Sequence, residues 1–229
     1  MNKNYKFQVE IEKYLYDSYS ELCVQYGIDE KEYPLEIVDV KGEFAITYSN
    51  LYKFDCKTAQ DLAERYVADN TFDGTLMYNK LFCTLKDGTI VQRIIVPRYR
   101  LIEYLFNNIN IDPIFIKGHL RQSLQHEIGH MLSNIEILSQ ENGHDILVED
   151  NKKQIEMWNA YIKEHDFDTL DDGGLIEYYT YYNNLPMEKK ANEKVGLDAM
   201  AMAITDITLM RMSDIEEDEP EETETKTND

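Results

Sequence analysis

Residues 120–135, LRQSLQHEIGHMLSNI, combine a helical repeat of apolar residues with two histidines four positions apart. At about 100° per residue, the apolar side chains fall on one face of a helix, and they are Leu120, Leu124, Ile128, Met131, Leu132 and Ile135. His126 and His130 fall on the opposite face, with Gly129 beside them. The pattern predicts a helix packed on a core with both histidines turned away from it. That layout suits a metal cleft and also a solvated polar face.

The segment from His126 to His130 has the form HExxH. Two imidazoles at this spacing lie on one helix face, about 6 Å apart along the axis, so both can bind one Zn²⁺ ion. Glu127 then lies beside the metal, where it can take a proton from an activated water that attacks a carbonyl. We therefore assign His126 and His130 as candidate zinc ligands and Glu127 as the candidate catalytic base.

A third protein ligand is expected, because a catalytic zinc usually has three and keeps one position open. Glu136 has the spacing of the third ligand of a metzincin motif, but that motif needs glycine where this chain has Ser133, so Glu136 is excluded. His144 follows the expected end of the helix, and Glu177 lies in a tyrosine-rich segment downstream. Both stay open as alternatives to the candidate that we rank first.

That first candidate is Glu188, near the start of a helix expected after Pro186. Several mostly apolar residues share one face of this helix with Glu188 and are expected to point inward. They are Ala191, Asn192, Val195, Ala199 and Met202, and we call them the inward stripe. A carboxylate at the head of such a stripe needs a buried partner, and a metal ion is a good one. A glutamate in a first turn also suits the helix dipole without any metal.

The remaining sequence predicts an α+β fold, with a small N-terminal mixed sheet followed by a mostly helical half. Helices are expected at 6–26, 58–69, 98–107, 116–139 and 151–164, and from Pro186 to about Met212. Strands are expected at 35–38, 44–48, 81–85 and 89–96, the last two forming a hairpin around Asp87-Gly88. We expect one domain over residues 1–212 and a disordered acidic tail over 213–229.

Charge and composition exclude several classes of function. The chain of 229 residues has 44 acidic against 23 basic residues and a net charge of -21, which disfavours binding to nucleic acid or to anionic membranes. Its three cysteines contain no CxxC pair, so no disulfide framework or cysteine zinc site is expected. No signal peptide or membrane-spanning segment is predicted, which makes the cytoplasm the expected location.

The two motifs together resemble a known family. His126-Glu127-Ile128-Gly129-His130 followed by Glu188-x-x-Ala191-Asn192 is similar to the zincin-like metallopeptidases of the ImmA/IrrE type, over about Leu120 to Ala203. The resemblance implies a zincin-like fold, with two ligands and the base from HExxH and the third ligand from the glutamate of ExxAN. The interval between the motifs is longer here and includes a helix around Trp158.

The expected function is therefore zinc-dependent hydrolysis of peptide bonds in a protein or peptide substrate, with Zn²⁺ as cofactor. The alternative is a zinc-binding regulatory or interaction protein that keeps the scaffold without turnover. A tyrosine from the segment 178–182 is a candidate for stabilising an oxyanion, although tyrosines at helical spacing are more often core residues. Neither the substrate nor the oligomeric state follows from the sequence.

Overall fold

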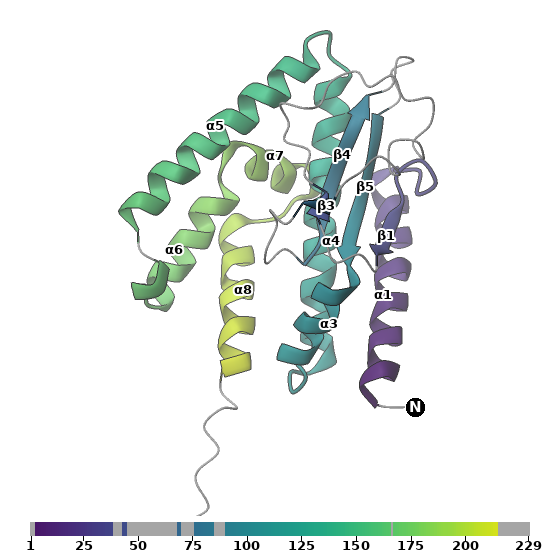
Figure 1. The fold of residues 1–229 in the computed structure, drawn as a ribbon, viewed down its shortest axis with the longest axis vertical. Coiled ribbons are helices and arrows are strands. Elements are labelled where there is room, and N and C mark those ends of the chain that lie inside the picture. The colour runs from purple at the N-terminus through teal and green to yellow at the C-terminus, as the bar shows by residue number, and fades with distance from the viewer. Residues whose placement is uncertain are drawn as a thin grey trace, which may run out of the picture.

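The chain folds into a mixed α+β architecture that is mostly helical, which confirms the predicted class (Figure 1). A computed structural model describes residues 3–38, 43–44, 68–69, 76–84, 90–165 and 167–214. A long central helix, α4 (Pro113–Leu138), contacts the sheet and most of the other helices. The sheet and α1 (Lys3–Tyr26) lie to one side of α4, and the helices of the C-terminal half gather on the other side (Figure 1).

The principal sheet has three strands in the order β1-β5-β4, with bounds β1 Leu35–Val38, β4 Tyr78–Thr84 and β5 Ile90–Pro97. The pairing of β4 with β5 is antiparallel, as the hairpin prediction required, and β1 pairs with β5 in parallel. A register shift between Leu81 and Cys83 interrupts the hairpin ladder. The sheet is thus mixed, and β4 forms one of its edges, beside α4.

Local signals explain where α3 (Arg98–Asn107) and α4 begin. Pro97 ends β5 and directly precedes α3. The Asp112 side chain accepts a hydrogen bond from the Ile114 backbone N–H at 2.9 Å, and Pro113 occupies the first turn, where no N–H is needed. α4 therefore starts one turn earlier than the sequence periodicity predicted.

The next helix, α5 (Gly143–Glu164), begins eight residues before the predicted position. Gly143 is the first residue of α5 and directly follows the turn after α4. A Cβ on Gly143 would lie 2.2 Å from the Ile137 carbonyl oxygen, so glycine is needed for the tight reversal between the two helices. A short 3-10 helix (Phe167–Thr169) then leads to α6 (Asp172–Asn183).

The long C-terminal helix predicted from Pro186 to Met212 is wrong, because the structure has two helices there. They are α7 (Pro186–Val195) and α8 (Ala199–Asp214). Gly196 adopts φ 71° and ψ 31°, a left-handed conformation that ends α7. The Leu197 N–H then bonds the Asn192 carbonyl at 2.9 Å, and the Asp198 side chain accepts from Ala201 N–H at 2.8 Å to start α8.

One hydrophobic core joins α1, the sheet, α3 and α4. Its fully buried members include Ile11, Leu15, Ile94, Val96, Leu101, Ile116, Leu120, Leu124, Ile128 and Met131. The core thus fixes one face of α4 against the N-terminal half and leaves the other face for the C-terminal helices. No helix among the described residues is long and apolar enough to span a membrane.

Several predicted elements lie partly or wholly outside the described residues. The prediction of a helix at 58–69 is wrong at its C-terminal end, because β3 (Ala68–Asp69) pairs there with β2 (Glu43–Phe44). The rest of that segment, most of the strand 44–48, the hairpin turn and the acidic residues 215–229 lie outside the described residues. The division into a domain at 1–212 and a tail at 213–229 stays a prediction.

Candidate metal centre

One face of α4 is buried and the opposite face carries the two histidines, as its sequence predicted. Four apolar side chains are fully buried on the core face, and they are Leu120, Leu124, Ile128 and Met131. The side chains of His126 and His130 are 12% and 17% exposed and face α7 rather than the core. The helical repeat therefore buries one face of α4 and presents both imidazoles to a second helix.

The histidines meet the glutamate that we ranked first. Glu188 Oε2 lies 3.1 Å from His126 Nε2 and 3.0 Å from His130 Nε2, and the two imidazole nitrogens are 3.1 Å apart. The potential ligand atoms of these residues all lie within 4.8 Å of one another. Two imidazole nitrogens and one carboxylate oxygen that converge in this way could hold a metal ion.

Asn192 fixes the orientation of the first histidine. The Asn192 side-chain nitrogen donates to the Asn183 carbonyl at 3.0 Å, so its oxygen faces His126. That oxygen lies 2.7 Å from His126 Nδ1 and can only accept, so Nδ1 carries a proton. Nε2 is then the nitrogen directed at Glu188, as a metal-ligating histidine with a supporting hydrogen bond requires.

The charges and hydrogen bonds of this group shift the pKa values of His126 and Glu188 in opposite directions. Burial on its own lowers the pKa of His126, but hydrogen bonds to Glu188 and the charges of Glu127 and Glu188 outweigh it and raise the pKa to about 9. Burial would raise the pKa of Glu188, but the two histidines hold it well below its usual range. Without a metal, a proton on His126 thus balances the buried Glu188 carboxylate.

Glu127 is placed between the histidine group and the edge of the sheet. Its Oε2 accepts a hydrogen bond from the Asn79 backbone N–H on β4 at 2.5 Å. Burial raises the pKa of the Glu127 carboxyl, although the charges of His126 and His130 and the bond from Asn79 lower it in part. A carboxyl with a raised pKa beside three possible metal ligands is suited to accepting and returning a proton.

Gly129 allows the two helices of the site to approach closely. A Cβ at this position would lie 2.2 Å from the Ala191 carbonyl oxygen and 2.7 Å from its carbon. Contacts this short are not tolerated between rigid backbones, so only glycine fits between α4 and α7. Glu188 and Asn192 flank Ala191 on α7, and the missing side chain at 129 is what lets them reach the histidines.

Two polar residues of the site gave no signal in the sequence. Gln154 on α5 donates from Nε2 to Glu188 Oε1 at 2.9 Å and accepts from Met187 N–H at 2.8 Å. Asn79 contributes through its backbone, which no side-chain pattern can reveal. Asn192, in contrast, was visible as part of the inward stripe of α7.

The other candidate ligands lie apart from this group. Glu136 is exposed and pairs with Lys194, which agrees with its exclusion. Glu177 is exposed on α6, and His144 lies in the first turn of α5 rather than in a returning loop. Among the described residues, the set with metal-ligand geometry is the one formed by His126, His130 and Glu188.

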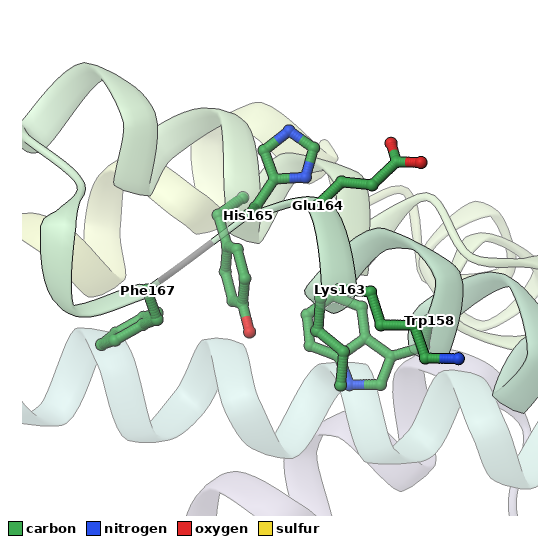
Figure 2. A pocket seen from close by; sticks show the side chains of 7 residues that line it. Trp158, Lys163, Glu164, His165 and Phe167 are labelled. Carbon is green, nitrogen blue, oxygen red and sulfur yellow. The ribbon is translucent and has the colours of Figure 1, made fainter.

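The tyrosine-rich segment forms an aromatic cluster between α5 and α6. Trp158 makes edge contacts with Tyr178 and Tyr182, at ring-centroid distances of 5.0 and 5.2 Å. A pocket of about 450 Å³ lies beside this cluster. Figure 2 shows side chains that line it, with Trp158 and Phe167 on opposite sides of the view. The pocket contains none of the candidate ligands, and Tyr178 packs against the rings of Trp158 and Phe167, as Tyr182 does against Trp158.

A second hydrogen-bonded group includes another histidine of α4. His119 Nδ1 lies 2.9 Å from the Tyr104 hydroxyl, and His119 Nε2 lies 3.1 Å from Asp206 Oδ1. Burial, followed by the charge of Asp206, raises the pKa of Tyr104. The group links α3, α4 and α8, and it lies two turns of α4 before His126.

The chain matches none of the protein-family models, curated proteins or solved structures with which it was compared. The resemblance to zincin-like metallopeptidases therefore rests on the two motifs. The observed group of His126, His130 and Glu188 is compatible with a metal site, independently of any family.

Proposed function

We propose that this protein is a zinc-dependent metallopeptidase that hydrolyses peptide bonds in a protein or peptide substrate. The observation that carries the proposal is the convergence of His126, His130 and Glu188 beside the carboxyl of Glu127. Two histidines and one glutamate match a known ligand set of catalytic zinc, in which a fourth position stays open for water or substrate. When bound, Zn²⁺ would supply Lewis acidity, lowering the pKa of a water molecule and polarising a carbonyl.

Residues of the chain itself would transfer the proton and orient the metal ligands. Glu127 would accept the proton of the attacking water and return it to the amine that leaves, which is general base and then general acid catalysis. The Asn79 N–H holds Glu127 Oε2, so Oε1 is the oxygen that we assign to proton transfer. Asn192 would keep His126 Nε2 directed at the metal through its bond to Nδ1.

Metal content and peptide cleavage test the proposal together. We expect wild type to bind about one zinc per chain and to cleave casein or a peptide library. Glu188→Gln should lose zinc binding, whereas Glu177→Gln, the same change at the exposed rival glutamate, should keep it. Glu127→Gln should keep the zinc and lose cleavage, because it removes only the base.

The outcomes separate the two candidate functions. Zinc binding without cleavage of any substrate would remove the peptidase proposal and leave the non-catalytic zinc protein. Failure of wild type to bind zinc would remove both. Zinc binding that survives Glu188→Gln and is lost in Glu177→Gln would overturn the ligand assignment.

A further inference from the structure

We propose that Gln154 of α5 is a positioning residue that restricts Glu188 to one ligand oxygen. The inference rests on the metal centre of the proposed function. Its basis is the pair of bonds made by the Gln154 side-chain amide, one to Glu188 Oε1 and one to the Met187 backbone N–H. A single side chain thus contacts both the candidate ligand and the first turn of its helix.

The orientation of this amide follows from the chemistry of its partners. The Met187 N–H can only donate, so the Gln154 oxygen must face it, at 2.8 Å. The amide nitrogen then faces Glu188 Oε1 at 2.9 Å and can only donate to it. Glu188 must therefore offer an acceptor at Oε1.

The two oxygens of Glu188 consequently have different partners. Oε2 faces the imidazole nitrogens of His126 and His130 at 3.1 and 3.0 Å, and Oε1 is held by Gln154. With Oε1 held in this way, Glu188 would bind a metal through Oε2. The fourth position of the ion would then stay available for water or substrate.

Contacts of α5 on either side hold Gln154 in place. One turn earlier, Asp150 forms an ion pair with Lys190 of α7. One turn later, Trp158 packs against Tyr178 and Tyr182 of α6. α5 is therefore fixed against both neighbouring helices, and Gln154 reaches the ligand from a rigid support.

Two substitutions separate positioning from simple structural support. Gln154→Leu removes both hydrogen bonds. Gln154→Glu keeps an acceptor for the Met187 N–H but replaces the donor that faces Glu188 with a second acceptor. Gln140→Leu, at an exposed glutamine, is the matched control. Each protein is measured for Zn²⁺ and Co²⁺ affinity, for the visible spectrum of bound Co²⁺, and for melting without metal.

We expect both Gln154 variants to bind metal about 10- to 100-fold more weakly than wild type, the usual effect of losing a residue that supports a ligand. The Co²⁺ spectrum of Gln154→Leu should change, because release of Oε1 lets both oxygens of Glu188 bind and raises the coordination number. Without metal, Gln154→Glu should melt below wild type, because its carboxylate faces the carboxylate of Glu188 even though the Met187 N–H keeps its acceptor.

Wild-type affinity and spectrum in both variants would overturn the inference while the metal centre itself stands. A loss of affinity in Gln154→Leu with an unchanged Co²⁺ spectrum would also overturn it, because Gln154 would then act only as structural support. If wild type binds no metal, the proposed function fails first, so the two failures are distinguishable.

Discussion

Replacing Gly129 with alanine tests whether the close approach of α4 and α7 sets the geometry of the site. The added Cβ would lie 2.2 Å from the Ala191 carbonyl oxygen and 3.1 Å from Ala191 Cα. These atoms belong to helix backbone and cannot rotate away as a flexible side chain would. The two helices must therefore separate by about 1 Å to restore an ordinary contact.

The size of this displacement decides the expected effect. Metal–ligand distances hold within about 0.2 Å, so a shift of about 1 Å at Ala191 is too large for Glu188, one turn away, to keep its place. We expect zinc affinity to fall at least tenfold, by about 1.4 kcal/mol or more. Overpacking destabilises a fold by about 1–3 kcal/mol, and the higher helix propensity of alanine stabilises it by about 1 kcal/mol. The free energy of unfolding of the metal-free protein should therefore fall by up to about 2 kcal/mol.

Gly118→Ala is the matched control, because Gly118 lies on the same helix and an added Cβ there meets no atom within 4 Å. The free energy of unfolding of that variant should rise by up to about 1 kcal/mol, and its zinc affinity should equal that of wild type. The measurements are zinc titration against a competing chelator and urea unfolding of the metal-free proteins. Wild-type zinc affinity in Gly129→Ala, with no loss of stability, would refute the proposed role of the helix contact.

Three further predictions concern protons and supporting residues. The pKa of His126 is raised to about 9 from an ordinary 6.5, so the protonated imidazole stabilises the metal-free fold. This stabilisation is fully present below pH 6.5 and is lost as the pH rises through 9. Zinc must displace that proton, so zinc affinity should rise about tenfold per pH unit from 7 to 9, and calorimetry in buffers of different ionisation enthalpy should show about one proton released at pH 7. Asn192→Ala should weaken zinc binding about 10- to 100-fold. Asp206→Asn should lower the melting temperature by weakening the bond between α8 and His119, without changing zinc affinity.

Each of these predictions has a clear contrary result. Zinc affinity that is flat from pH 7 to 9 would contradict the protonated state of His126. Zinc binding by Asn192→Ala at wild-type strength would show that the tautomer of His126 needs no support. A loss of zinc affinity in Asp206→Asn would mean that the His119 group and the candidate metal centre are coupled, contrary to the two-turn separation along α4.

The sequence determined the features that depend on neighbours within one helix. The spacing of HExxH placed His126 and His130 together, and the apolar repeat predicted which face of α4 is buried. The same reasoning put Glu188 at the head of an inward stripe that the structure confirms on α7 as far as Val195, whereas Ala199 and Met202, which were predicted to continue it, belong to α8. These predictions succeeded because the geometry of a helix is regular, and side chains three or four positions apart share a face wherever the helix packs.

Tertiary structure decided which of these faces meet and which other groups join them. The contact of Gln154 with Glu188 spans 34 positions, and that of Asn79 with Glu127 spans 48. Such contacts arise only when packing brings distant segments together, and helical periodicity holds no information about that distance.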